Sequence, residues 1–394
     1  MRILVANLGS TSFKYKLFDL TADGETVLAE GAADRIGNPP SAWEVTADGR
    51  EVSGEADLAD HGAAIELHLK QLADIGVCDV DDLEAIGFKA VHGGAISAPT
   101  VVDDELLAVM ERFSDVAPAH NPPYIAAMRA FAERLPRVPQ VAAFETGYHQ
   151  TIPMKRQVYA IPYEWTTELG VRRYGFHGAS HRYIATRMGE IAPACRKIIS
   201  CHIGGSSSIS AIDGGVSVAN SFGMTAQSGI PHGGRVGDFD TFAILKLIQA
   251  GDDLDTVFQR LGKEGGLAAI GGVGSDMRDI EAAAAGGNDR AQLAFDVLVE
   301  SVRHYIGAYL AVLNGADAIC FTGGIGQHSN AARAAILSDM DYAGIVLDTE
   351  KNDTANGREE GRIDAAGSGT QLWVLPTNEE LIVARQTAAA LNGS

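Results

Sequence analysis

Two glycine- and hydroxyl-rich turns, one in each half of the chain, are suited to grip a phosphate. The first spans residues 9–12 and the second spans residues 204–208, and each follows an apolar segment. Glycine lets a ligand approach the backbone closely, and consecutive amide groups form a concavity that binds anions. The hydroxyls of Ser10 and Ser12 and the ammonium of Lys14 add donors to the first turn. A single turn of this kind is typical of an ordinary hairpin, but two matched copies predict a duplicated domain with a phosphate between the copies.

Basic and imidazole side chains recur where apolar segments end beside glycine or proline. They are Lys89, His92, His120, His149, His177, His202 and Arg235. Taken singly, each is more typical of a structural side chain. Together they lie where open α/β sheets bind ligands, and they are the donors that offset the charge of a phosphoryl group in transfer.

Carboxylates suited to a divalent cation follow the same pattern. Glu145 ends an apolar segment, and Glu379 and Glu380 follow the last one. Mg²⁺ takes one or two carboxylates and completes its shell with phosphate oxygens and water. A buried carboxylate at Glu145 requires a cation or a basic partner. A salt bridge from Glu145 to Lys89 or Arg235 is the structural alternative, and it remains open.

Two further glycine-rich stretches suit a nucleotide. Residues 322–326 break an apolar segment, and residues 271–278 lead into a helical pattern. In the second stretch, Asp276 is placed to cap the helix and Arg278 to stack on an adenine face. Each signal is weak by itself.

The elements that must position these residues alternate between strands and helices, which predicts an α/β fold. Expected strands are 2–9, 12–20, 85–91, 138–144, 197–202, 209–212, 318–322 and 371–376, with further strands within 27–52. Expected helices are 57–76, 103–113, 122–134, 238–249, 253–261, 276–284, 290–314 and 378–391. Residues 350–370 are expected to form a surface loop, and residues 153–163 to cross between the halves.

Composition narrows the class of protein. A chain of 394 residues suits two domains, and a formal net charge of −20 argues against nucleic-acid and anionic-membrane partners. No apolar run reaches the roughly 20 residues of a membrane helix, and the first residues lack the pattern of a signal peptide. Four scattered cysteines without metal-ligand spacing indicate free thiols in a reducing cytoplasm.

These motifs, in this order and over nearly the whole chain, resemble the acetate kinase family, within the group that also holds sugar kinases, Hsp70 and actin. The stretches that carry the resemblance are Asn7-Leu8-Gly9-Ser10-Thr11-Ser12, Val91-His92-Gly93-Gly94, Ala117-Pro118-Ala119-His120-Asn121-Pro122-Pro123, Tyr148-His149-Gln150-Thr151, Arg173-Tyr174-Gly175-Phe176-His177-Gly178, Cys201-His202-Ile203-Gly204, Gly234-Arg235-Val236-Gly237-Asp238, Thr322-Gly323-Gly324-Ile325-Gly326 and Pro376-Thr377-Asn378-Glu379-Glu380-Leu381.

The resemblance implies a duplicated, ribonuclease H-like ASKHA fold, as in actin, with two domains and an interdomain cleft. The first domain is expected at 1–150, with a C-terminal helix of about 380–394 packed back on it. The second, at 151–379, is expected to carry the nucleotide site. A homodimer is also implied.

The implied activity is transfer of a phosphoryl group between ATP and a small carboxylate, with Mg²⁺ or Mn²⁺ as cofactor and ATP or ADP as co-substrate. The resemblance places the metal on Asn7 and Glu379 and the reacting centre at Lys89, Glu145, His177 and Arg235. It places the phosphates and nucleotide at Ser10, Ser12, Lys14, His202, Gly204, Gly205, Asp276, Met277, Arg278, Gly324 and Ile325. The carboxylate pocket falls on Val91, Ala119, His120, Phe176 and Ala226.

Several positions depart from the family pattern. Lys89 and Glu145 stand where the family has arginine and aspartate, and the two changes are expected to compensate if the groups meet across the cleft. Ala119 and Ala226 replace a leucine and a proline, with Gln227 and His232 nearby, which predicts an acid larger or more polar than acetate. Two other functions stay open: pyrophosphate as the donor, or a catalytically weak regulatory protein that binds nucleotides.

Overall fold

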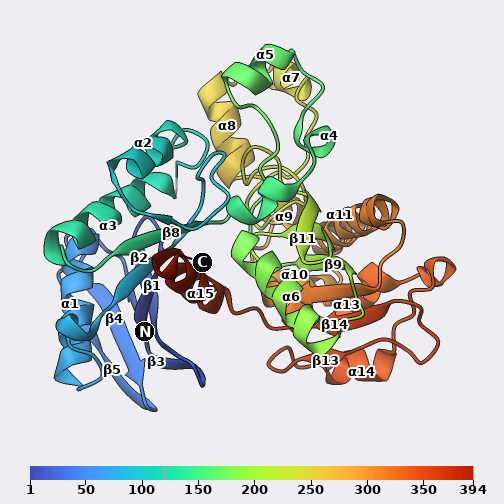
Figure 1. Cartoon of the computed structure of the whole chain (residues 1–394). Coiled ribbons are helices and arrows are strands. Elements are labelled where there is room, and N and C mark those ends of the chain that lie inside the picture. The colour runs from blue at the N-terminus through green and yellow to red at the C-terminus, as the bar shows by residue number, and fades with distance from the viewer. Residues whose placement is uncertain (119, 394) are drawn as a thin grey trace. The chain divides into compact units, whose positions relative to one another are not determined.

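The computed structural model describes residues 1–118 and 120–393 (Figure 1). It divides into two compact units, each built on its own sheet. Unit 1 comprises Met1–Gln150 and Asn378–Ser394, and unit 2 comprises Thr151–Thr377. The predicted α/β class is confirmed. Glu379 lies in unit 1, because the second crossing of the chain falls just before the last helix rather than after residue 379.

Unit 1 contains an eight-stranded sheet in the order β5-β4-β3-β2-β1-β6-β8-β7. Its strands are β1 (Arg2–Leu8), β2 (Ser12–Thr21), β3 (Gly24–Asp34), β4 (Ser41–Ala47), β5 (Arg50–Ala56), β6 (Ala85–Ala90), β7 (Thr100–Val101) and β8 (Gln140–Phe144). The three central strands β1, β6 and β8 run parallel. Their carboxyl ends therefore meet at one edge, which is where ligands bind in open α/β sheets.

The two faces of this sheet bury different helices. Along β1, Leu4 and Ala6 pack into the core that includes α1 and α3, whereas Ile3 and Val5 pack with Val383 of α15. This alternation follows from the two-residue period of a strand. The helices of unit 1 are α1 (His61–Asp74), η1 (Val80–Asp82), α2 (Asp104–Arg112), α3 (Asn121–Arg134), η2 (Gly147–Thr151) and α15 (Glu379–Asn392).

Unit 2 contains a six-stranded sheet in the order β11-β10-β9-β12-β14-β13. Its strands are β9 (Lys197–His202), β10 (Ser208–Asp213), β11 (Val216–Asn220), β12 (Ala318–Thr322), β13 (Gly361–Arg362) and β14 (Gln371–Val374). The strands β9, β12 and β14 run parallel. The predicted hairpin of the second turn is β9 with β10, and Ser208 pairs with His202 at its mouth.

Helices surround the sheet of unit 2, and the long α11 contributes Ala294, Leu298, Val302 and Ile306 to its core. They are α4 (Met154–Gln157), α5 (Tyr163–Glu168), α6 (Gly178–Ile191), α7 (Ala243–Gln249), α8 (Leu254–Lys263), α9 (Gly266–Gly271), α10 (Met277–Ala285), α11 (Asp289–Leu313), α12 (Gly323–His328), α13 (Asn330–Leu337), η3 (Asp341–Ala343) and α14 (Thr349–Thr354).

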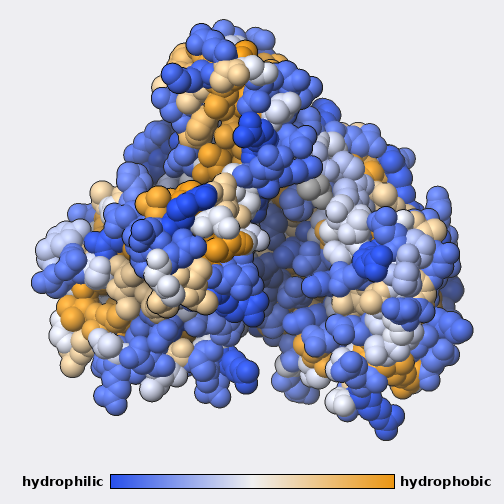
Figure 2. All heavy atoms as spheres, turned by 180° about the vertical axis from the view of Figure 1, so that it is seen from behind, coloured by the Kyte–Doolittle hydropathy of each residue, from blue (hydrophilic) through white to orange (hydrophobic). Residues whose placement is uncertain are grey.

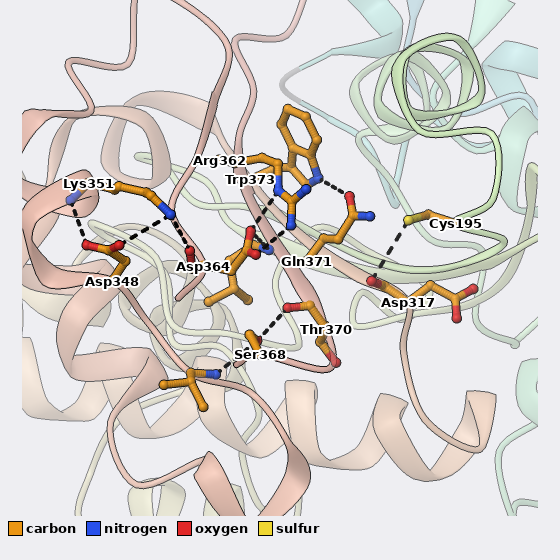
Figure 3. Close-up of polar contacts among 12 residues, drawn as sticks. Cys195, Asp317, Asp348, Lys351, Arg362, Asp364, Ser368, Thr370, Gln371 and Trp373 are labelled. Atoms are coloured by element: carbon orange, nitrogen blue, oxygen red, sulfur yellow. Dashed lines mark hydrogen bonds and ion pairs between the residues drawn. The ribbon is translucent and has the colours of Figure 1, made fainter. Parts of the chain in front are cut away.

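One expectation for unit 2 was wrong, and one segment has structure that was not predicted. The segment 350–370 is not a plain surface loop, since it contains the end of α14 and strand β13. Figure 3 shows why it is ordered: the Asp364 carboxylate accepts hydrogen bonds from Arg362 at 2.9 and 2.6 Å, and Lys351 donates to the Asp364 carbonyl at 2.8 Å. The glycine-rich break at 322–326 begins a helix, because the amides of Ile325 and Gly326 donate to the Ile203 carbonyl.

Apolar side chains are exposed on α7 and α8. Figure 2 shows apolar surface on the lobe of unit 2 that carries these helices. The exposed residues are Phe242, Leu245, Ile248, Leu254 and Phe258. Within the described residues, no helix has the length and apolar content that would let it span a bilayer.

Candidate active site

The first turn joins β1 to β2 in unit 1. Ser10 is exposed and Ser12 is partly buried, while Lys14 is exposed on β2 and pairs with Asn7 across the hairpin. The Gly9 amide donates to the Ser12 carbonyl at 2.9 Å, which closes the turn. A Cβ at Gly9 would lie 2.5 Å from the Ser12 hydroxyl, so a larger residue there would displace that hydroxyl.

Two side chains that the sequence did not single out hold this turn. The His61 Nε2 lies 3.0 Å from the Gly9 carbonyl. The Tyr124 hydroxyl accepts from the Leu8 amide at 3.1 Å and donates to the Asn7 Oδ1 at 3.2 Å. Burial raises the pKa of Tyr124 to about 12, so it remains a donor. The amide oxygen of Asn7 is thereby held at the end of β1.

Lys89 on β6 forms a short ion pair within unit 1. Its Nζ lies 2.6 Å from the Glu379 Oε2, and the two side chains are 18% and 15% exposed. Burial opposes the charged form of Lys89, but the charges of Glu379 and then Glu145 outweigh it and raise the pKa of the ammonium. Two of the predicted residues, one for the reacting centre and one for the metal, are thus in direct contact.

Glu145 follows β8, and its amide donates to the Ala90 carbonyl of β6 at 2.8 Å. It is 6% exposed and acts on Lys89 through its charge. The condition under which the two changes were expected to compensate, a meeting of Lys89 and Glu145 across a cleft, is not met, because both stand at the end of adjacent parallel strands in one sheet. That placement follows from the register, in which Lys89 pairs with Ala143.

Three predicted pocket residues belong to unit 1. Val91 follows β6 and is partly buried, and His120 lies directly before α3. Ala119 lies outside the described residues. His92 also lies in unit 1, where its ring stacks on that of Phe113 at 4.4 Å and its Nδ1 accepts from the Gly94 amide.

The second turn joins β9 to β10 in unit 2. The Ser207 hydroxyl donates to the Gly204 carbonyl and accepts from the Gly204 amide, each at 3.1 Å. The Ser207 amide donates to the Nδ1 of His232 at 2.9 Å. His232 is 1% exposed, and burial followed by the charge of Arg235 lowers its pKa to about 3. It therefore supports the turn as a neutral core residue and does not make the pocket more polar.

A cavity of about 600 Å³ joins the predicted phosphate and adenosine residues of unit 2. It is lined by Gly204, Gly205, Ser275, Asp276, Met277, Arg278, Glu281, Gly324, Ile325, His328 and Ser329. A Cβ added at Gly205 or Gly324 would meet no atom within 4 Å, so both glycines leave open space there. Cavities of this size hold small-molecule ligands and cofactors.

The walls of this cavity are held by local contacts. Asp276 caps α10 as predicted, with the Arg278 amide donating to its carboxylate at 2.9 Å. The Arg278 guanidinium also pairs with Asp276 and keeps the pKa of that carboxyl down at about 2. Sequence reasoning missed Glu281, His328 and Ser329, because no spacing pattern links α10 to α12.

Histidines and aromatic rings gather at the start of α6. His177 lies directly before the helix with a left-handed backbone, φ 56°, which is uncommon for a residue with a side chain. Its ring lies 4.2 Å from that of His202 and 5.2 Å from that of Phe222. Phe176 packs edge-on to Phe222 at 5.5 Å and is 3% exposed.

Arg235 lies in the loop between β11 and α7. Its Nη1 donates to the Ala226 carbonyl at 2.7 Å, so the main chain of a predicted pocket residue orients it. Burial lowers the pKa of Arg235 from its usual value. A Cβ at Gly266 would lie 2.7 Å from the Arg235 amide nitrogen, and this close packing fixes the loop that carries the guanidinium.

Comparison with known proteins identifies the family. Residues 2–385 match the model of the acetokinase family. An acetate kinase of Halothermothrix orenii is 41% identical over 98% of this chain and 99% of its own, and one of Clostridium botulinum is 43% identical over 98% of each. The crystal structure of Porphyromonas gingivalis acetate kinase aligns with TM-score 0.92, 36% identity and 99% coverage of both chains.

A propionate kinase structure from Francisella tularensis subsp. tularensis aligns with TM-score 0.91 and 30% identity, covering 98% of this chain and 99% of that one. The likeness therefore extends over both units, in sequence as well as in backbone. The predicted resemblance and the fold that it implied are confirmed: this chain belongs to the acetokinase family.

Proposed function

We propose that this chain transfers the γ-phosphoryl group of ATP reversibly to a small carboxylate, with Mg²⁺ or Mn²⁺ as cofactor. Membership of the acetokinase family supports a phosphotransferase that acts on a carboxyl group, with ATP or ADP as co-substrate. The observation that supports a nucleotide as the phosphoryl donor is the cavity of about 600 Å³ beside the second turn. Its volume suits a nucleoside attached to phosphates better than it suits pyrophosphate, which would leave the part lined by Met277 and Ile325 unfilled.

In the proposed reaction, a carboxylate oxygen forms a bond to the γ-phosphorus while the bond from that phosphorus to the β-γ bridging oxygen breaks. The products are an acyl phosphate and ADP. No general base is needed, because carboxylates are ionised near neutral pH. Rate enhancement then comes from positioning and from donors that offset charge on the phosphoryl oxygens. We assign those donors to Arg235, His177 and Lys89, with Glu145 holding the charge state of Lys89.

Each turn is proposed to offer donors to phosphate within its own unit. Ser10, Ser12 and Lys14 supply two hydroxyls and an ammonium from unit 1, and Gly204, Gly205 and His202 line the path in unit 2. Asp276, Met277, Arg278, Gly324 and Ile325 would surround the adenosine. Val91, His120, Phe176 and Ala226 would contact the acceptor.

The donor chemistry of unit 1 fits the proposed cation. Asn7 and Glu379 offer hard oxygen ligands, which Mg²⁺ prefers. Within the described part of the chain, no three His, Cys, Asp or Glu side chains gather into a metal cluster, and few protein ligands are typical of Mg²⁺ held through phosphates. When bound, the cation would neutralise charge on the phosphates. Lys89 contacts the same carboxylate, so it would share or yield Glu379.

The acceptor is proposed to be larger or more polar than acetate. Ala226 is partly exposed and places only a methyl group where the family has a proline, and the neighbouring Gln227 is exposed. Burial of His232 removes one of the polar groups on which this expectation relied.

Hydroxamate trapping of acyl phosphate, across a panel of carboxylates and with ATP or pyrophosphate as donor, tests the proposal. Arg235→Ala should lower kcat by about 10²–10³-fold while the KM for ATP stays near wild type, because its donor acts on the reacting group. Arg196→Ala, at an exposed arginine directly before β9 and at the opposite end of that strand from the turn, is the control. Fastest turnover on acetate would refute the acceptor proposal, and no transfer above background would indicate a regulatory protein.

A second copy of the chain is the proposed partner. The exposed apolar residues on α7 and α8 support it, since large apolar patches mark interaction sites. Sedimentation should show a dimer that Phe242→Asp weakens. A monomer at micromolar concentration would refute this.

The four buried cysteines, none of them in a disulfide, also support a reducing cytoplasm as the location.

A further inference from the structure

Buried serine hydroxyls connect the histidines at the start of α6. The Ser208 Oγ lies 2.8 Å from the Nδ1 of His177 and 2.8 Å from the Nε2 of His181. The Nδ1 of His181 lies 2.8 Å from the Ser200 Oγ. Ser200, His181 and Ser208 are each 0% exposed. The four side chains therefore form one chain of hydrogen bonds that runs from the core to His177.

The Ser200 end of this series of hydrogen bonds determines which atom is the donor in each bond. The hydroxyl of Ser200 contacts His181 and no other hydrogen-bond partner within residues 1–118 and 120–393. If His181 donated from Nδ1, the Ser200 proton would be buried without an acceptor, and a buried unpaired donor is costly. Ser200 therefore donates to the Nδ1 of His181. A cationic His181 is excluded for the same reason and because its charge would be buried.

The direction then passes to His177. With Nδ1 as acceptor, a neutral His181 carries its proton on Nε2 and donates to Ser208. A serine hydroxyl has one proton, so Ser208 directs that proton to the Nδ1 of His177. The remaining nitrogen of His177, Nε2, then carries the proton and is a hydrogen-bond donor. In a histidine, the bond at one ring nitrogen sets the tautomer presented at the other.

A second, shorter arm repeats this arrangement. The Ser180 Oγ, also 0% exposed, lies 2.8 Å from the Nδ1 of His202. Among the described residues, the Ser180 hydroxyl has no other hydrogen-bond partner. By the same reasoning, it therefore donates its proton to the Nδ1 of His202. His202 is then also an Nε2–H tautomer, and its ring lies 4.2 Å from His177. Two neutral rings tolerate this distance, whereas two cations would repel.

We infer that His181, Ser200, Ser208 and Ser180 are positioning residues that hold His177 and His202 as neutral Nε2–H donors for phosphoryl oxygens. The inference rests on the phosphate-facing roles given to these two histidines under the proposed function. The left-handed backbone of His177 agrees with it, because a strained conformation persists only where its surroundings hold it.

Long-range ¹H–¹⁵N spectra of the full chain with ¹⁵N-labelled histidine test the inference directly. At neutral pH, the wild-type rings of His177 and His202 should show a bare Nδ1 and a protonated Nε2. His177→Gln and His202→Gln assign the two signals. In Ser208→Ala, His177 should populate both neutral tautomers while His202 keeps its own, a change that a merely structural serine would not produce.

Kinetics give a second measurement. Ser208→Ala should lower kcat by about 10- to 100-fold with the KM for ATP unchanged, the range seen when a partner that orients a functional histidine is removed. Ser210→Ala is the matched control, since Ser210 is a buried serine of the same strand whose hydroxyl contacts Ser217 and Ala219 instead. His181→Gln, which can donate near the place of Nε2, should retain more activity than His181→Phe.

The two proposals fail separately. An Nδ1–H or cationic ring at either histidine in the wild-type spectrum overturns the inference and leaves the proposed reaction standing. Equal loss of activity in Ser208→Ala and Ser210→Ala also overturns it. Absence of phosphoryl transfer in the wild type overturns the proposed function, whatever the tautomers are.

Discussion

The Lys89–Glu379 ion pair gives the sharpest test of how unit 1 is held together. Replacing Lys89 with methionine keeps most of the side-chain volume and removes the ammonium. At 2.6 Å and an effective dielectric constant of about 20, the gross attraction is about 6 kcal/mol. Desolvation offsets much of this attraction, but loss of one partner strands the other as a buried charge, which costs about 3–5 kcal/mol. Glu145 loses the attraction of the same ammonium, which adds to the cost.

Urea unfolding at pH 7, followed by Trp43 fluorescence, would measure this loss. Trp43 is one of three tryptophans and lies in unit 1, so Trp165→Phe and Trp373→Phe isolate its signal. Lys89→Arg keeps the charge and should change the unfolding free energy by less than about 1 kcal/mol. The double variant Lys89→Met with Glu379→Gln should lose at least about 1 kcal/mol less than the sum of the two single variants. Additive losses would show that the pair is not coupled and would refute the reasoning.

Two more outcomes follow from the fold. Gly324→Val should raise the KM for ATP by at least about tenfold without lowering stability, because the valine side chain would enter the open space of the cavity. The control is Gly189→Val, on the exposed face of α6. Unchanged ATP binding in Gly324→Val would contradict the proposed nucleotide site. Burial lowers the pKa of His68 to about 4, so the unfolded chain binds the extra proton between about pH 6.5 and 4. The unfolding free energy of unit 1 should therefore fall by up to about 3 kcal/mol as the pH drops through that window, and acid urea titrations should show a smaller fall in His68→Phe.

The sequence patterns accurately located the strands that position the candidate site. The reason is that β1, β6 and β12 are short apolar runs that end abruptly in polar or glycine residues. The sequence accordingly placed Asn7 and Lys89, two predicted site residues, near the ends of β1 and β6, where the structure has them. The partner of Lys89 was not, since Glu145 and Glu379 were equally acidic and the choice depends on how α15 packs on the sheet.

The histidine chain was also invisible in the sequence. Ser200 lies in an expected strand and Ser208 in the second predicted phosphate turn, and His181 has no motif of its own. Their contacts depend on the antiparallel register of β9 with β10 and on α6 lying beside them. The helix that begins at Gly323 was not predicted either, for a different reason. Glycine usually ends a helix, but Gly323 has φ 75° and turns the chain into α12 with the Ile203 carbonyl as its anchor.

Unit 1 is assembled from both ends of the chain, with α15 covering Ile3 and Val5. During synthesis on the ribosome, that face of the sheet must wait for the final residues to be translated, whereas unit 2 is complete once Thr377 has emerged. Nascent unit 1 therefore presents an uncovered apolar sheet face for most of translation, and chaperones recognise surfaces of this kind. A premature stop before residue 378 would leave that face bare permanently and would also delete Glu379. Loss of the segment from residue 378 onward is thus expected to cost solubility and a proposed metal ligand in one event.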